Sequence, residues 1–165
     1  MKRNILIIAG TIAALALGFG VVRVGAGSDV AKIRKATAKY HSTEAAQSAG
    51  YVLVPGLDYC FDNPGVGGMG FHYIHTASLD TTLDVLHPEA LVYAPGHNGQ
   101  LQLGAVEYIV PAEAWDLAGN TEPPMLLGRH LHLNEALGVY VLHAWVWKNN
   151  PSGMFEDWNP KVSCP

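Results

Sequence analysis

Apolar positions recur with two different periods, and the change of period divides the chain into a helical and an extended part. Residues 28–40 and 42–50 carry apolar side chains at helical spacing, which predicts two amphipathic helices, the second ended by Gly50. From Tyr51 onward, β-branched and aromatic residues gather in runs bounded by turn residues, which is typical of strands. These runs are residues 51–54, 71–75, 90–95, 101–111 and 138–147.

The order of these elements predicts the fold class. Helices that come first and strands that follow favour an α+β fold with an antiparallel sheet. We therefore expect N-terminal helices packed on a curved antiparallel sheet, with the helical content confined to that end of the chain.

The first 26 residues differ from the rest. Lys2 and Arg3 precede an apolar run over residues 5–22, and Val24 and Ala26 are small residues suited to a cleavage site. Together they match the three parts of a secretory signal peptide, residues 1–26. A run of this length is also about the minimum for a membrane span, so an uncleaved anchor is the alternative. In both cases we expect an exported protein, periplasmic or extracellular, that meets a membrane only through this segment.

Residues 27–165 are enough for one globular domain with its own core. Three of the ten basic residues precede Gly27 and all fourteen acidic residues follow it, so seven basic against fourteen acidic side chains give this part a formal charge of −7. It also holds all eight histidines. Because nucleic-acid affinity rests largely on Lys and Arg that neutralise phosphates, we expect no nucleic-acid partner. A metal ion or a small ligand fits this charge better.

The sequence contains two cysteines, Cys60 and Cys164. In an exported protein an even count predicts a disulfide. Closing a loop of about 100 residues would stabilise the fold by at most ~4 to 5 kcal/mol in the chain-entropy model. The alternative is a thiolate that binds metal or acts as a nucleophile, which needs a neighbouring Cys or a reducing compartment, and the sequence indicates neither.

Gly65, Gly67 and Gly70 have the spacing of a dinucleotide-binding loop. Such a loop needs a strand before the glycines and a helix after them, because the helix N-terminus holds the pyrophosphate. Here a turn precedes the glycines and an extended segment follows. We interpret them as residues of turns or of a β-bulge, with close approach of the backbone at the mouth of a pocket.

Two pairs of histidines have spacings that matter for metal binding. His72 and His75, three apart, point to opposite faces of a regular strand and can share an ion only if the strand ends or bulges between them. His130 and His132, two apart, would share a face if their segment is extended, and would diverge if it is helical or irregular. His130 and His132 are therefore the weaker candidates for metal ligands.

Polar residues also interrupt two apolar strand faces. Glu107 falls on the face that carries Leu101, Leu103, Ala105 and Ile109. A glutamate on such a face is either buried or lines a cavity.

His143 falls on the face of residues 139–147 that carries Trp145 and Trp147, and the alternate face of this run is apolar as well. That pattern predicts an internal strand with a buried His143. Since a buried carboxylate and a buried imidazole are costly unless paired, Glu107 and His143 would satisfy each other or coordinate an ion. A structural pair inside the sheet is the alternative.

Glu89 shares its face with Leu91 and Tyr93 and is a further candidate for the same cavity. The candidate metal ligands are therefore His72, Glu107 and His143, with His130 and His132 as weaker ones. The candidate ligand-binding residues are His72, Glu89, Tyr93 and Trp145.

The closing stretch, residues 147–164, contains two Asn-Pro steps, a Ser-Gly step and no periodicity. It predicts an ordered loop whose end is fixed by Cys164. Trp147, Phe155 and Trp158 are expected to pack over the sheet as part of the core, with a role in lining a ligand pocket as the alternative.

Four stretches stand out as blocks: GMGFHYIH, HPEALVYAP, LGAVEYIVP and the closing LHAWVWKNNPSGMFEDWNPKVSC. They resemble the corresponding blocks of a family of exported bacterial proteins without an assigned activity, over residues 40–164. The resemblance implies site candidates at the positions that match the family's His, Glu, Glu and His, which are His72, Glu89, Glu107 and His143. The family block reads His-Tyr-Val-Asn, so His75 departs from it, which weakens a site that combines His72 with His75.

No Gly-x-Ser-x-Gly, His-Glu-x-x-His or Cys-x-x-Cys motif is present. We expect a small exported binding protein whose concave sheet face presents a His/Glu-lined pocket to a divalent transition metal, zinc or copper, or to a small ligand. The second hypothesis is an enzyme in which Glu107 and His143 are the catalytic acid–base pair. The third is a structural protein in which that pair is buried and inert.

Overall fold

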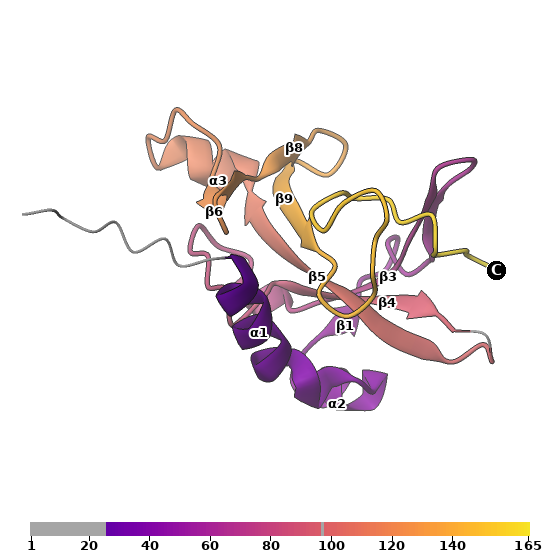
Figure 1. Ribbon diagram of the computed structural model, residues 1–165. Coiled ribbons are helices and arrows are strands. Elements are labelled where there is room, and N and C mark those ends of the chain that lie inside the picture. The colour runs from indigo at the N-terminus through magenta and orange to yellow at the C-terminus, as the bar shows by residue number, and fades with distance from the viewer. Residues whose placement is uncertain (1–25, 97) are drawn as a thin grey trace, which may run out of the picture.

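The computed structural model describes residues 26–96 and 98–165. Two helices, α1 (Ala26–Thr37) and α2 (Thr43–Ser48), are joined by a 3-10 turn, η1 (Ala38–Tyr40), and pack on an antiparallel sheet (Figure 1). The predicted α+β class and the N-terminal helices are confirmed. The predicted signal peptide or anchor falls on the segment before α1, and its residues 1–25 lie outside the described part of the chain.

Across the described ranges, none of the helices combines the length and the apolar character that crossing a membrane requires.

The main sheet has seven strands in the order β1-β3-β4-β5-β9-β8, with β2 paired to β3 as well. All pairs are antiparallel. The strands are β1 (Val52–Leu53), β2 (Phe61–Asn63), β3 (Gly67–Ile74), β4 (Ala90–Pro95), β5 (Leu101–Pro111), β8 (His132–Asn134) and β9 (Val139–Ala144). Each of the five runs predicted from the sequence therefore contains a strand.

The segment between β5 and β8, for which the sequence predicts no element, is structured. It contains α3 (Ala112–Leu117) and a two-stranded sheet of β6 (Met125–Leu126) and β7 (Arg129–His130), while a second 3-10 turn, η2 (Thr76–Ser78), follows β3. The prediction that helices are confined to the N-terminal end is wrong at α3. Six residues are too few to show a helical period, so this helix left no pattern to detect.

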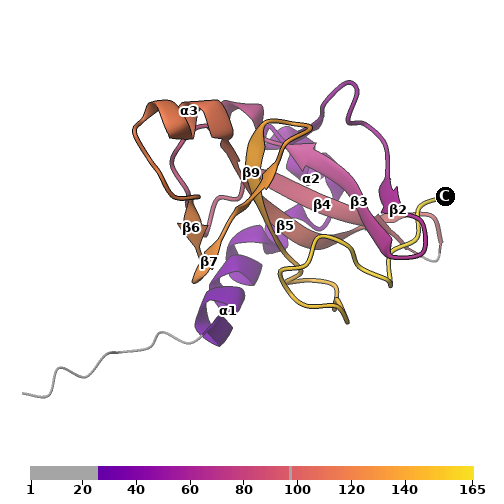
Figure 2. The ribbon, with the colours of Figure 1, turned by 90° about the horizontal axis from the view of Figure 1, so that it is seen from above.

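The two faces of the main sheet are covered differently. On one face, which we call the helix face, apolar strand residues form a single core with Ile33 of α1 and Ala46 of α2. On the other, which we call the loop face, Val162 of the C-terminal loop packs on Val92 and Trp145. In Figure 1 α1 and α2 lie below the sheet and the yellow loop above it, and in Figure 2, seen from above, α2 lies behind the strands.

A bulge in β5 changes which residues share a face with Glu107. Tyr93 pairs with Leu103 while the preceding Val92 pairs with Ala105, so Gly104 is an extra residue in β5. As a result Leu103 belongs to the helix face, and Ala105 to the loop face. The prediction that Leu101 and Leu103 share the face of Glu107 is wrong for this reason.

A second correction concerns the end of β9. This strand ends at Ala144, so the alternation of faces does not continue to Trp147. The Trp147 indole Nε1 instead donates a hydrogen bond to Thr37 Oγ1 of α1, at 3.0 Å, and its ring packs against the helix-face core.

The glycine-rich stretch is the beginning of β3. A register shift between β2 and β3 sets Phe61 opposite Gly70 and Asp62 opposite Gly68. Gly70 has φ +108°, and a Cβ there would lie 2.3 Å from the carbonyl oxygen of Tyr93 in β4. A bulge and a close backbone approach are thus both present, as expected from the spacing.

Cys60 and Cys164 form the predicted disulfide, 104 residues apart in sequence. It lies just before β2 and fixes the end of the C-terminal loop, which also bridges to β3 because Asn159 N donates to Gly68 O at 2.9 Å. A structural disulfide of this kind indicates an oxidising compartment outside the cytoplasm.

Candidate metal site

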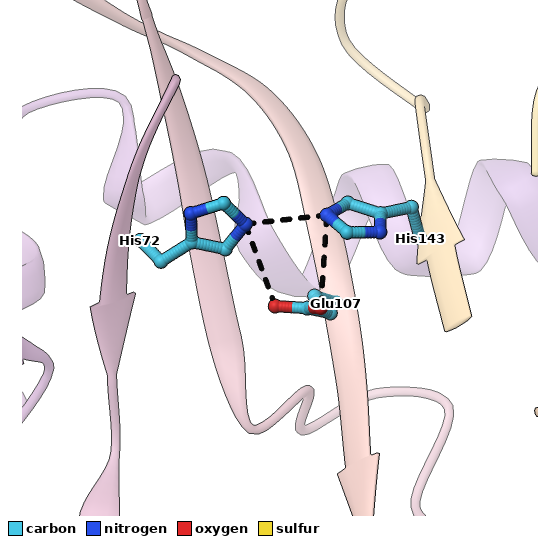
Figure 3. A group of neighbouring side chains, drawn as sticks. All are labelled: His72, Glu107 and His143. Atoms are coloured by element: carbon cyan, nitrogen blue, oxygen red, sulfur yellow. Dashed lines mark hydrogen bonds and ion pairs between the residues drawn. The ribbon is translucent and has the colours of Figure 1, made fainter. Parts of the chain in front are cut away.

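Three strands of the loop face each contribute one polar side chain to a buried group. His72 comes from β3, Glu107 from β5 and His143 from β9 (Figure 3). Glu107 and His143 are direct partners in the β5–β9 register. β4 lies between the strands of His72 and Glu107, and there His72 pairs with Val92 whereas Glu107 pairs with Ala90.

The donor atoms of the group meet closely. His72 Nε2 and His143 Nε2 are 3.2 Å apart. Each imidazole Nε2 lies 3.6 Å from one oxygen of the Glu107 carboxylate. The three residues are only 7%, 6% and 1% exposed for His72, Glu107 and His143.

This geometry could hold a metal ion, because one ligand atom from each residue lies within 4.8 Å of the others. In the described part of the chain it is the one such group of three. Imidazole nitrogen and carboxylate oxygen are ligands that zinc, copper and iron accept in proteins.

Burial and charge act in opposite directions on the two imidazoles. Burial lowers the pKa of His72 to about 4, with Glu107 opposing that shift only in part. For His143, burial also acts to lower the pKa, but Glu107 and Asp157 together outweigh it and raise the pKa above its ordinary value. Of the two imidazoles, His143 therefore holds a second proton more firmly, and its Nε2–H can donate to His72 Nε2.

Asp157 completes the group from the C-terminal loop. Its Oδ1 lies 3.1 Å from His143 Nδ1, and its Oδ2 lies 3.1 Å from His132 Nε2. Burial opposes ionisation of Asp157, but the hydrogen bond to His143 and the nearby imidazoles hold its pKa below the usual range. An ionised Asp157 accepts a hydrogen bond from His143 Nδ1–H and so keeps a proton on that nitrogen. When Nε2 loses its own proton, its lone pair faces His72 and Glu107.

The sequence reasoning missed Asp157. It lies in a loop without periodicity, so no face could be assigned to it. The signal that could have found it is the disulfide, because tying Cys164 to Cys60 brings the acidic pair Glu156 and Asp157 near the strand that carries His72.

Three of the predicted ligand-binding residues do not join this group. The carboxylate of Glu89 accepts a hydrogen bond from the backbone N–H of Ile109 at 3.0 Å, and burial raises its pKa to about 7. Tyr93 lies in the helix-face core, where its hydroxyl donates to the carbonyl of Tyr40. Trp145 lies beside His143 with ring centroids 6.4 Å apart, but its indole is held by the carbonyl of Glu156.

The other histidines considered from the sequence, His130, His132 and His75, lie in different elements of the fold. His130 lies in β7 of the small sheet, exposed, with Nδ1 3.1 Å from Pro123 O. His132 lies in β8 of the main sheet and reaches the site through Asp157. The strands of these two histidines belong to different sheets, and of the two only His132 lines the pocket. His75 follows the end of β3 and packs against Tyr51.

A pocket of about 260 Å³ opens onto the group. Its polar wall consists of the three donors with His132, Asn134 and Asp157. Its apolar wall on the sheet is formed by Ile74, Ile109, Val139 and Val141. Trp158 of the closing loop lines the pocket too, whereas Phe155 packs with the helix-face core.

Comparison of the chain with models of known protein families, with curated proteins and with solved structures gives no match.

Proposed function

We propose that the protein is an exported small binding protein that holds a divalent transition metal ion, zinc or copper, on His72, Glu107 and His143. The observation that carries the proposal is the convergence of three buried donors from β3, β5 and β9 within 4.8 Å. Membership of the family of exported bacterial proteins named above, and export through the N-terminal segment, are part of the same proposal.

Desolvation supports an ion at this position. Burying a carboxylate and two imidazoles costs free energy unless each finds a partner. The contacts from Glu107 to the two imidazoles are 3.6 Å long, beyond a good hydrogen bond. A divalent cation would accept a lone pair from all three groups at once.

The surroundings of the donors also fit a metal site. Metal-bound imidazoles usually donate their other N–H to a carboxylate, and Asp157 offers such an acceptor to His143 Nδ1. Cys60 and Cys164 are both in the disulfide, so neither offers a thiolate as a metal ligand. Two His and one Glu are a set that zinc uses with an open fourth position.

An enzyme is the second candidate, and the contact between Asp157 and His143 favours it. A histidine oriented by a carboxylate, beside Glu107 in a pocket, has the arrangement of an acid–base pair. An inert structural pair is less well supported, because the group lines a pocket of about 260 Å³ and is not sealed in the core. Loss of turnover without loss of folding in a Glu107→Gln variant would favour the enzyme over the binding protein.

Elemental analysis tests the proposal. The domain is expressed with export and purified without chelator, beside His143→Ala and the control His87→Ala, which removes an exposed histidine outside the pocket. We expect about one equivalent of metal in the parent and in the control, and loss of it in His143→Ala with an unchanged circular dichroism spectrum. Absence of metal from the folded parent, even after loading with zinc and copper, would overturn the proposal.

A further inference from the structure

The apolar wall of the pocket follows directly from the strands that carry the donors. Each donor has an apolar residue two positions away on the same strand face, and these residues line the pocket. They are Ile74 after His72, Ile109 after Glu107 and Val141 before His143. Ile74, Ile109 and Val141 belong to one buried apolar cluster. The pocket thus places a continuous apolar surface beside the donor group, which is the arrangement of small-molecule sites.

The charge at the donor group selects the head group of a ligand. A divalent ion held by Glu107 and two neutral imidazoles carries a net charge of one positive unit. Asp157 is ionised as well, but its two oxygens contact imidazole nitrogens of His143 and His132 and are not among the three donors. Because the ion and its three direct ligands would carry a positive charge beside an apolar wall, a ligand with one negative oxygen donor matches the open position on the ion.

The size of the pocket limits the body of the ligand. Pockets for drug-sized molecules have volumes of about 300–1,000 Å³, and this one measures about 260 Å³. The pocket is therefore suited to a body smaller than a drug-sized molecule, such as a single ring or a short branched chain. The mouth carries Leu137, which is 48% exposed and lines the pocket.

From these three observations, and resting on the metal site proposed above, we infer that the loaded pocket binds a small monocarboxylate with an apolar body. The carboxylate oxygen takes an open position on the ion, and the body lies on Ile74, Ile109 and Val141. No covalent step is involved.

Cobalt(II) provides the test, because its visible absorption changes with the number and type of its ligands. The chelator-treated, full-length protein is loaded with Co²⁺ and titrated with benzoate and, in parallel, with acetate. We expect both to change the spectrum, and benzoate to bind about tenfold more tightly or better, because only benzoate carries an apolar ring to bury.

A matched pair of variants tests the contribution of the wall. Leu137→Ser removes an apolar contact at the mouth, whereas Leu117→Ser changes an exposed leucine outside the pocket. Benzoate should bind roughly threefold more weakly to Leu137→Ser, with acetate unchanged, and neither ligand should distinguish Leu117→Ser from the parent. Metal-free protein should not bind benzoate, as followed by tryptophan fluorescence.

The outcomes separate this inference from the metal proposal. Failure of Co²⁺ to bind stoichiometrically, or equal binding to the parent and to His143→Ala, would overturn both. Stoichiometric Co²⁺ with a spectrum that benzoate leaves unchanged would overturn the monocarboxylate alone. Equal affinities for benzoate and acetate, or equal benzoate binding with and without metal, would also overturn it.

Discussion

The helix face and the loop face are built from alternate residues of the same strands, yet they bury polar groups in different ways. On the helix face, the hydroxyls of Tyr51, Tyr93 and Tyr108 each donate to a backbone carbonyl outside the sheet. On the loop face, His72, Glu107 and His143 have one another as partners. Both faces thus bury polar groups. On the helix face these groups bind backbone carbonyls, whereas on the loop face they contact one another, and this difference distinguishes a core from a site.

The covers of the two faces differ in the same sense. The helices bring apolar side chains to the helix face, and their contact with it is a hydrophobic core. The C-terminal loop brings Val162 to the loop face but also Asp157, which contacts the buried group directly. We therefore expect changes on the helix face to act on stability, and changes under the loop to act on metal binding.

The largest effect should come from removing the tie that holds the loop. Replacing Cys60 and Cys164 together by Ser opens a loop of 104 residues, which should lower the free energy of unfolding by ~4 to 5 kcal/mol in the chain-entropy model. Guanidinium unfolding measures the difference. We also expect weaker zinc binding by the folded variant, because Asp157 is then less firmly placed. Unchanged stability would show that the loop is held by its backbone hydrogen bonds alone.

A cavity in the helix face should destabilise the fold without changing the site. Leu91 is fully buried, so Leu91→Ala should cost about 2–5 kcal/mol, while the folded fraction keeps its metal. Leu117→Ala, at a position 80% exposed, is the control and should change little. Urea unfolding and metal analysis of the folded protein check both statements. Loss of metal from folded Leu91→Ala would contradict the expectation that changes on the helix face act on stability and not on metal binding.

Glu89 is a buried carboxylate that lies outside the site, and it should respond to pH. Burial raises its pKa to about 7 in the folded state, above the value of about 4.3 in an unfolded chain. The folded state thus favours the protonated form, so this contribution to stability is full below pH 4.3, falls as the pH rises and is lost above pH 7. Glu89→Gln, which keeps an acceptor for Ile109 N–H, should be more stable than the parent at pH 8 by on the order of 1–3 kcal/mol.

Thermal unfolding at pH 5 and pH 8 measures this effect, and Glu113→Gln provides an exposed control. The advantage of Glu89→Gln should shrink as the pH falls to 5. An advantage that is the same at both pH values would mean that Glu89 does not titrate in this range.

The smallest effect should come from Asp157→Asn. The amide can still accept a hydrogen bond from His143 Nδ1, but it lacks the charge that stabilises the imidazole, so zinc affinity should fall roughly tenfold. Competition with a chromophoric chelator measures the affinity, and Asp116→Asn, an exposed aspartate of α3, serves as the control. An affinity equal to that of the parent would mean that the loop covers the site without tuning it.

Much of the fold could be predicted from the sequence because the periods of helix and strand are local properties. Glu107 and His143 were identifiable for the same reason, since each breaks the apolar alternation of its own strand. The bulge at Gly104 was missed, although an isolated glycine inside a strand is a signal for one. Whether the extra residue is present depends on the pairing with β4, which the local pattern does not show. Glu89 alternates with Leu91 and Tyr93, which lie on the helix face, whereas Glu107 and His143 lie on the loop face. Glu89 was assigned to the site because the local pattern of one strand does not show which of its faces meets a given face of another strand.

The C-terminal loop carries Asp157, the last residue of the site in chain order. His72, Glu107 and His143 precede Asp157 in the chain, and the bond between Cys60 and Cys164 closes only where an oxidant is present. A chain that crosses a membrane N-terminus first would present its three donors before their supporting carboxylate arrives. If the protein is exported and binds metal as proposed, the disulfide would add to metal affinity only in an oxidising compartment.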